Sequence, residues 1–268
     1  MSDETPLGKP TSYSDQYDPD LLFAIPRREA RKALRLGPDL PFHGSDIWNA
    51  WELTWLEPTG TPRCATVEIS VPVDSPNIVE SKSLKLYLNS FSMSSFDSLD
   101  VVRGTLQRDL SAVAQSDLSV SCTVATGESP VEDFPGECID LVDARCTHYQ
   151  LDASMLRAGG ETVSMAVHSH LLRSMCPVTG QPDIGSVLIS YTGPRIDNAS
   201  LLQYIVSYRD HNDYHEACVE RMFVDISERC QTDRLTVYAR YQRRGGIDIN
   251  PFRSDFEQSA PNIRLWRQ

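Results

Sequence analysis

"TVSMAVHSHLLRSMCPVTGQPDIGSVLISYTG", residues 162–193, contains two apolar runs separated by a polar loop. The runs at 162–172 and 185–193 are rich in Val, Ile and Leu, which is typical of β-strands. The loop between them is too short to hold a crossover helix, so we expect the two strands to pair antiparallel. This stretch favours an α+β fold on an antiparallel sheet over a parallel βαβ winding.

The same order of elements, strand–strand–helix–strand, is predicted in both halves of the chain. In the first half we expect strands at 64–73 and 83–91, a helix at 95–114 and a strand at 118–126. In the second half we expect strands at 162–172 and 185–193, helices at 198–208 and 213–229, and a strand at 234–242. A short helix within 24–37 and a strand within 45–60 are also expected. Apolar residues three and four positions apart predict the helices, and the repeat predicts two related modules.

The run "SLKLYLNSF" at 83–91 supplies the clearest alternation of the first half. Leu84, Leu86 and Leu88 fall on one face of an extended strand, which is why we expect a strand here. The module boundaries follow from the repeat. We expect an N-terminal arm at 1–35, a first module at 36–130, a connector at 131–160 and a second module at 161–268.

The composition limits the function classes. The 268 residues carry a formal net charge of −12, which argues against a general nucleic-acid binder because such proteins present a basic face. The stretch "MSDETPLGKPTSYSDQ" is polar and lacks the apolar core of a signal peptide. No run of about 18 apolar residues is present. We therefore expect a cytoplasmic protein without a membrane span, whose seven cysteines are free thiols.

The loop "RSMCPVTGQPD" places a thiol between the two strands of the second half. Cys176 follows the first strand, and Asp183 lies at the far end of the loop. A free cysteine is more often a buried core residue. Side chains in a loop held by a rigid sheet are often functional, however, and a thiolate is a strong nucleophile. A carboxyl group across the loop could be its proton partner.

The stretch "RDHNDYHEACVERMF" raises the question of a metal site. His211, His215 and Cys218 have a spacing that would suit zinc on one helical face. Two observations weaken that interpretation: "HND" is typical of a helix start, so His211 would precede the helix, and His215 begins an apolar stripe that faces the core. A buried His215 with structural hydrogen bonds is the main alternative. Glu216 lies on a neighbouring face and is available for a ligand.

Two further groups of polar residues could bind a ligand. His168 and His170 share one face of a strand and could chelate a metal, but no third ligand is evident from the sequence. They more often pack or hydrogen-bond locally. In the segment "NIVESKSLKLYL", Glu80 and Lys82 could bind a polar heterocycle or a phosphate. The alternative is the polar face of an amphipathic strand.

The segment "RYQRRGGIDINPFRS" combines basic residues with a glycine pair. Arginine binds phosphate in a bidentate manner, and glycine lets the backbone approach a ligand closely. We expect this cluster to receive an anionic cofactor, with a solvated strand end as the alternative. The cluster contains Arg240, Arg243, Arg244 and Arg253 around residues 245–246. No dinucleotide-binding or Walker-type glycine motif is present.

Five segments together resemble one family, the NADPH-dependent 7-cyano-7-deazaguanine reductases (QueF family). They are, in chain order, "LPFHGSDIWNAWELTWL", "ESKSLKLYLNSF", "CPVTGQPDIGS", "HNDYHEACVER" and "VYARYQRRGGIDINPFRS". The resemblance extends over nearly the whole chain and is similar to the long, two-module form of the family. It implies two tandem T-fold (tunnelling fold) modules, with antiparallel sheets and helices on one face.

The resemblance also implies an activity and the residues that carry it. The nitrile of 7-cyano-7-deazaguanine would be reduced to an aminomethyl group through a covalent cysteine thioimide, as a step toward queuosine in tRNA, with NADPH as the cofactor. By position, the implied catalytic residues are Cys176, Asp183 and His215. The implied substrate contacts are Val79, Glu80, Ser81, His215 and Glu216. The implied NADPH contacts are Ser81, Lys82, Arg244 and Gly245, and no metal is implied.

Three other functions stay open on the residues alone. A zinc-dependent hydrolase of the GTP cyclohydrolase kind would use His211, His215 and Cys218 as ligands. A binding module would hold a purine-like ligand without turnover, and a thiol-based nitrile hydrolase would need no NADPH. We expect a small-molecule substrate, no direct contact with nucleic acid or membrane, and a homodimer, because T-fold modules usually close their sheets against partners.

Overall fold

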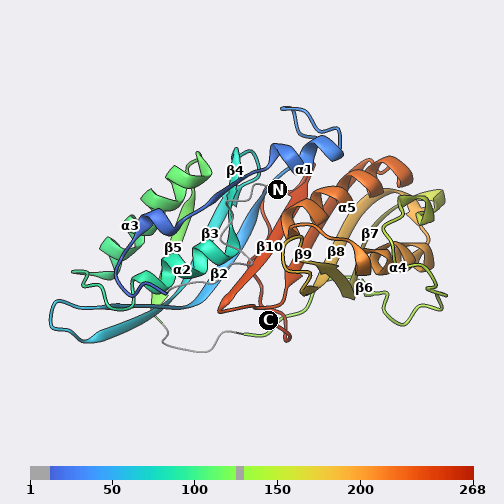
Figure 1. Ribbon diagram of the computed structural model, residues 1–268. Coiled ribbons are helices and arrows are strands. Elements are labelled where there is room, and N and C mark those ends of the chain that lie inside the picture. Colours follow the sequence, from blue (N-terminus) through green and yellow to red (C-terminus); the bar gives the residue numbers. More distant parts are fainter. Residues whose placement is uncertain (1–12, 125–129) are drawn as a thin grey trace. The chain divides into compact units, whose positions relative to one another are not determined.

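The computed structural model describes residues 13–124 and 130–268, and the chain forms two compact units (Figure 1). Unit 1 contains the described residues of Met1–Lys32, Asp46–Glu128 and Arg243–Asp248. Unit 2 contains the described residues of Ala33–Ser45, Ser129–Gln242 and Ile249–Gln268. Each unit therefore draws on both halves of the sequence. The beginning of the expected arm and the end of the strand expected at 118–126 lie outside the described residues.

Unit 1 is built on antiparallel strands covered by two helices. Strand β3 lies between β2 and β5, and β1 pairs with β4 in an antiparallel ladder. Figure 1 shows α2 and α3 on the same side of this sheet. The strands are β1 (Ala24–Pro26), β2 (His43–Leu56, which begins in unit 2), β3 (Pro62–Pro72), β4 (Asn77–Val79) and β5 (Ser119–Val124). The helices are η1 (Pro19–Leu21), α1 (Arg28–Ala33, which ends in unit 2), α2 (Ser81–Ser90) and α3 (Leu99–Ala114).

Unit 2 contains a longer sheet in the order β10-β9-β8-β7-β6. The pairs are antiparallel except β6 with β7, which is parallel. Helices α4 and α5 lie on one face of it (Figure 1). The strands are β6 (Glu137–Cys138), β7 (Ala158–Met175), β8 (Pro182–Ile196), β9 (Arg234–Tyr241) and β10 (Ile247–Ser254, which begins in unit 1). The helices are η2 (Ala153–Met155), α4 (Asn198–Ser207), η3 (Tyr208–Asp210) and α5 (His215–Cys230). The expected α+β class with mainly antiparallel sheets is confirmed.

The strand predicted at 83–91 is wrong, because this stretch is helix α2. Glu80 caps the helix, since its carboxylate oxygens accept from the backbone N–H groups of Lys82 and Ser83, each at 2.8 Å. The buried residues Leu84 and Leu88 are four positions apart, so they share a helical face as well as a strand face. The alternating leucines are therefore compatible with a strand and with a helix. The capping bonds of Glu80 favour the helix.

The remaining predicted helices and strands agree with the structure, with shifted ends. The helix predicted at 95–114 begins instead at Leu99, where Ser98 is the N-cap residue and its Oγ accepts from Val101 N. Phe96 lies outside the helix and stacks on Phe91, with ring centroids 5.0 Å apart. Strand β10 was not predicted as a strand. Among the described residues, no helix is long and apolar enough to cross a membrane.

One sequence pattern is repeated in the helix pairs of the two units. Helix α2 contains "SLKLYLNS" and helix α4 contains "SLLQYIVS", which share Ser-Leu-x-x-Tyr-x-x-Ser. In unit 1, Tyr87 OH donates to Asp109 Oδ2 on α3 at 2.7 Å. In unit 2, Tyr204 OH donates to Asp225 Oδ2 on α5 at 2.8 Å. Each pair of helices is therefore joined by the same buried tyrosine–aspartate hydrogen bond.

Candidate active site

Cys176 lies in a tight loop between β7 and β8. Its backbone N–H donates to the carbonyl of Gln181 at 2.9 Å, and its carbonyl accepts from Gly180 N at 3.0 Å. Gly180 has φ of +65°, a conformation that glycine adopts without strain. The cysteine is buried, with 9% of its surface exposed. The two strands and these hydrogen bonds therefore fix the position of the thiol.

Asp183 and His215 are brought together at the same end of the sheet. Asp183 is the second residue of β8 and pairs in register with Ser174 of β7. It is almost fully buried, and its Oδ1 lies 3.4 Å from His215 Nε2. The position of His215 depends on the chain segment just before α5. In that segment the carbonyl of His211 accepts a hydrogen bond from Met175 N at 2.8 Å. This contact anchors the start of α5 beside the cysteine loop.

Tyr241 is part of this arrangement, although no sequence pattern pointed to it. Its ring stacks on the ring of His215, with centroids 3.9 Å apart and an interplanar angle of 29°. Burial, and then the charges of Cys218 and Asp183, raise the pKa of Tyr241 well above its usual value, so it stays a neutral phenol. Gly185 allows this packing, because a Cβ there would lie 3.1 Å from Tyr241 Cδ1. The imidazole is therefore held flat against an aromatic surface.

Glu216 follows His215 in the first turn of α5 and is 4% exposed. Tyr214, the N-cap residue, makes no capping hydrogen bond through its side chain. A carboxylate at a helix N-terminus is favoured by the helix dipole. Unit 2 thus places a thiol, a carboxyl group and an imidazole at one end of its sheet, with a second carboxyl group beside the imidazole.

The zinc set His211, His215 and Cys218 is not formed among the residues that the structure describes. His211 lies before α5, at the end of η3, so it does not share a helical face with the other two. Cys218 is fully buried on the core side of α5. Within the described ranges, Cys138, His168 and His170 form a group whose potential ligand atoms all lie within 4.8 Å of one another. Cys138 is therefore a candidate third ligand beside these two histidines.

Unit 1 holds the residues of the segment 79–82. Val79 is buried in the short ladder with Ala24. Glu80 is 1% exposed, and its carboxylate is held by the start of α2 as described above. Ser81 and Lys82 form the first turn of that helix and are partly exposed. The capping bonds fix the position of Glu80, and the adjacent Ser81 and Lys82 are accessible to a ligand.

The cluster of four arginines predicted from the sequence is only partly correct. Arg240 is buried, and its Nη1 donates to Tyr238 OH at 2.6 Å and to Asn262 Oδ1 at 2.7 Å. Arg253 is fully buried and forms an ion pair with Glu220 at 3.0 Å. These two side chains form their polar contacts inside unit 2, because they lie on β9 and β10 rather than in the glycine turn. They cannot receive an anionic cofactor.

The glycine turn itself lies in unit 1 and remains a suitable anion site. Arg244 N donates to the carbonyl of Ile247 at 2.8 Å, which closes the turn. Gly245 and Gly246 have φ of +60° and +81°. A Cβ on Gly245 would lie only 3.1 Å from Lys85 Cδ, so the glycine lets the turn pack closely against this lysine. A close backbone approach flanked by Arg244 and Lys85 suits a phosphate group.

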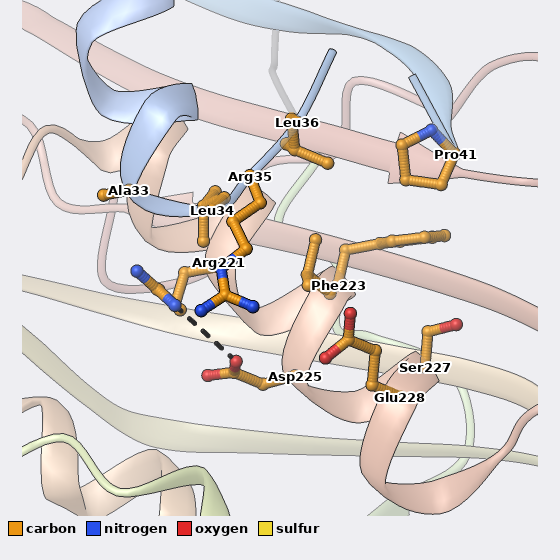
Figure 2. A pocket seen from close by; sticks show the side chains of 11 residues that line it. Ala33, Leu34, Arg35, Leu36, Pro41, Arg221, Phe223, Asp225, Ser227 and Glu228 are labelled. Atoms are coloured by element: carbon orange, nitrogen blue, oxygen red, sulfur yellow. Dashed lines mark ion pairs between the residues drawn. The ribbon is translucent and has the colours of Figure 1, made fainter. Parts of the chain in front are cut away.

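A pocket of about 420 Å³ lies elsewhere in unit 2, between the segment 33–41 and α5 (Figure 2). Its lining includes Leu34, Pro41 and Phe223, and an Arg221–Asp225 ion pair of 3.9 Å lies at one side. None of the residues expected from the sequence to act in catalysis or binding lines it. The pocket is therefore separate from the candidate site.

Comparisons with known proteins agree with the family that the motifs resemble. A family model described as "Nitrile reductase, 7-cyano-7-deazaguanine-reductase N-term" matches residues 13–122. A second, described as "QueF-like protein", matches residues 182–260. The apo crystal structure of an archaeosine synthase QueF-Like covers 38% of this chain and 99% of that chain, with 14% identity and a TM-score of 0.32. That likeness is too low to support an argument about the fold.

Two curated relatives cover almost the whole chain. A protein of Paraburkholderia phymatum is 53% identical over 271 residues, which is 99% of both chains. A protein of Paraburkholderia xenovorans is 52% identical over the same share. Both are named NADPH-dependent 7-cyano-7-deazaguanine reductase. The chain therefore belongs to the family of NADPH-dependent 7-cyano-7-deazaguanine reductases.

Proposed function

We propose that this chain reduces the nitrile of 7-cyano-7-deazaguanine to 7-aminomethyl-7-deazaguanine with NADPH, a step in queuosine biosynthesis. The observation that carries the proposal is the 53% identity over 99% of the chain to a reductase of that name. Unit 2 adds a chemical argument, because it places Cys176, Asp183 and His215 at one end of a rigid sheet. A nucleophile with nearby proton-transfer groups is what addition to a nitrile requires.

Cys176 is the proposed nucleophile. A nitrile carbon is a weak electrophile, and addition of a thiolate gives a covalent thioimide, which divides a difficult reduction into easier steps. The loop between β7 and β8 holds the thiol in a fixed position, which lowers the entropy cost of reaching the attacking geometry. Collapse of the tetrahedral centre after reduction releases the Cys176 thiolate and leaves an imine.

Asp183 is the proposed proton donor, with His215 as its neighbour. Charge develops on the nitrile nitrogen as the thiolate adds, so an acid must deliver a proton there. Asp183 is buried, and the contact of 3.4 Å with His215 links the two groups. Tyr241 packs against the imidazole and keeps its orientation fixed. His215 can therefore exchange protons with Asp183 while its ring stays in one plane.

Four residues of unit 1 are proposed to hold NADPH: Ser81, Lys82, Arg244 and Gly245. The Lys85 side chain lies close to the backbone of Gly245, so a second cation is near the turn. When bound, NADPH supplies hydride, and the four-electron conversion of a nitrile to an amine requires two equivalents. Arg244 provides a fixed charge for the phosphate, and the backbone turn allows close approach.

The proposed substrate contacts are Val79, Glu80, Ser81, His215 and Glu216. The buried carboxylates of Glu80 and Glu216 can accept hydrogen bonds from the N–H groups of a purine-like base. Buried acceptors of this kind reject analogues that lack the donors, because the acceptors would then be left unpaired. Both carboxylates lie at the start of a helix, and the capping bonds of Glu80 fix its acceptor position before the ligand arrives.

The finer architecture and the assembly are also proposals. We propose two tandem T-fold modules, supported by the tyrosine–aspartate bond that α2/α3 and α4/α5 repeat. A homodimer follows as the expected assembly, since the sheets of such modules close against partners. A biosynthetic enzyme acting on a free base is expected in the cytoplasm, without direct contact with nucleic acid.

Intact-protein mass spectrometry tests the covalent step. Wild-type protein mixed with 7-cyano-7-deazaguanine, without NADPH, should gain the mass of one substrate molecule, and added NADPH should remove it. Cys176→Ala should gain no mass, whereas the control Cys146→Ser should behave as the wild type. Mass gain in Cys176→Ala would place the nucleophile elsewhere, and no gain in any variant during active turnover would exclude the thioimide.

A further inference from the structure

We propose that Cys138, His168 and His170 form a binding site in unit 2 for a divalent cation of the zinc class. One ligand atom of each residue lies within 4.8 Å of the ligand atoms of the other two. A tetrahedral zinc ion lies about 2.0–2.3 Å from nitrogen and sulfur ligands. The three side chains thus need only small rotations to reach one ion. None of the proposed catalytic residues belongs to this group.

The fold assembles the group from distant parts of the sequence. Strand β6 pairs in parallel with β7, and Cys138 stands opposite His168 in the register. Ile139 N donates to the carbonyl of His168 at 2.9 Å, which locks this register. His170 lies in an irregular part of β7, between Ser169 and Leu172, where the ladder with β8 shifts. Bulges of this kind redirect side chains, and they are frequent next to functional sites.

The segment that carries Cys138 is closely fitted to β7. Gly136 has φ of +85°, and a Cβ there would lie 2.0 Å from the carbonyl oxygen of Ala166. Only glycine permits this approach. On the other side, the carboxylate of Asp140 accepts from Ser169 Oγ at 2.7 Å and from His170 N at 3.1 Å. Cys138 is therefore held in place from both sides, although its own side chain is exposed.

The histidines are oriented as metal ligands usually are. His168 Nδ1 lies 3.2 Å from the carbonyl oxygen of Pro135, which can only accept. The proton of a neutral His168 ring is therefore on Nδ1, and Nε2 presents a lone pair. His170 Nδ1 lies 2.8 Å from Ser186 Oγ, so its Nε2 is the available ligand atom. Partners of this kind fix the ring orientation around bound metals.

Asp133 can complete the coordination. Its Oδ1 lies 3.5 Å from His170 Nε2, and its side chain is 63% exposed. A modest rotation would turn this carboxylate to a metal, and a water molecule is the alternative fourth ligand. Thiolate and imidazole ligands favour zinc and similar transition metals over magnesium or calcium, which prefer oxygen. The carboxylates of Asp133 and Asp140 also give the site a negative charge that attracts a cation.

The test is a metal titration of full-length, reduced and metal-free protein. Zinc is added in competition with a chromophoric chelator, and cobalt is added separately to record its absorption spectrum. Wild type should bind one zinc equivalent at this site. Cobalt should give a thiolate charge-transfer band and the visible bands of a tetrahedral ion. A cobalt spectrum without the thiolate band would overturn the proposal whatever the variants do.

Matched variants locate the bound ion. Cys138→Ser and His170→Gln should each weaken zinc binding at least about tenfold, the usual minimum for disturbing a metal shell. Cys146→Ser and His148→Gln change a thiol and an imidazole outside the group and should bind as the wild type does. Cys176→Ala should also keep the equivalent. Unchanged affinity in Cys138→Ser and His170→Gln, or loss of the equivalent in Cys176→Ala, would overturn the site.

Discussion

The helix pairs α2/α3 in unit 1 and α4/α5 in unit 2 share a scaffold but differ at their N-termini. Besides the tyrosine–aspartate bond, Ser90 Oγ donates to the carbonyl of Tyr87 and Ser207 Oγ to that of Tyr204, both at 2.6 Å. The first helix of each pair is capped by a carboxylate. These repeated contacts stabilise the helix pairs, and a residue that repeats in both units needs no catalytic explanation.

The buried polar residues that do not repeat lie at different helix starts. In unit 1 the cap of α2, Glu80, is 1% exposed, and the first turn of α3 contains Asp100, whose side chain is 89% exposed. In unit 2 the cap of α4, Asp197, has a side chain that is 52% exposed, and α5 begins with His215, whose side chain is 14% exposed, and the buried Glu216. Burying an ionisable group is costly unless it is used or paired. The difference points to the start of α2 and the start of α5 as functional ends.

The largest effect is expected at Asp183, which has no role in the repeated scaffold. Asp183→Asn should lower kcat by about 10²–10⁴-fold, because loss of a general acid typically costs that much. Its unfolding midpoint should stay close to that of the wild type. Steady-state kinetics and thermal unfolding measure both quantities. Full activity in this variant would remove Asp183 from the mechanism.

The tyrosine–aspartate hydrogen bond should contribute more to the stability of unit 2 than to that of unit 1. Tyr204→Phe should lower the free energy of unfolding by about 2 kcal/mol and Tyr87→Phe by about 1 kcal/mol. The reason is that Asp109 keeps hydrogen bonds from Tyr17 OH at 2.6 Å and Arg108 Nε at 2.9 Å. Urea unfolding monitored by circular dichroism tests this order. A larger loss in Tyr87→Phe would contradict it.

The two helix caps give a sharper comparison. Glu80→Ala and Asp197→Ala should each cost about 0.5–2 kcal/mol of stability, the usual value of a cap. Only Glu80→Ala should also raise KM for the nitrile substrate, because Asp197 has no proposed substrate contact. Kinetics at saturating NADPH separate the two effects. Equal KM values in both variants would show that Glu80 acts only as a helix cap.

The smallest expected effect is a loss of stability at low pH. It arises in unit 2, where all six histidines of the chain lie. Burial, and then the charge of Arg221, lower the pKa of His211 from its usual 6.5. The unfolded chain therefore binds the proton more readily, and stability is lost as pH falls below about 6.5 toward the folded pKa. Urea unfolding at pH 8 and pH 5 should show a smaller loss in His211→Gln than in wild type. An equal loss in both would contradict this.

Much of the fold could be predicted from periodicity, and the exceptions have physical reasons. The long strands β7 and β8 contain apolar runs rich in Val, Ile and Leu on both sides of a short loop, so their identity was clear. Helix α2 was mistaken for a strand because Leu84 and Leu88 satisfy both periods, and the decisive capping bonds of Glu80 are invisible in a sequence. The roles of Arg240 and Arg253 also depend on burial, which clustering of charges does not reveal.

The candidate site was predicted in part. The cysteine loop and the start of α5 could be selected from residue types and motif resemblance, and the structure joins Asp183 to His215. Tyr241 was missed because an aromatic residue at a strand end carries no signal of its own. Cys138 was missed as a partner of the two histidines because a short parallel strand in a connector brings it there. Contacts between distant segments of this kind leave no local pattern.

Cys176 is proposed as the nucleophile of an NADPH-dependent nitrile reduction. The most direct measurement is NADPH absorbance in the presence of 7-cyano-7-deazaguanine, with wild type beside Cys176→Ala. We expect substrate-dependent loss of two NADPH per nitrile in wild type and a rate lower by about 10³-fold or more in the variant. Equal rates in both proteins, or no substrate-dependent loss in wild type, would contradict it.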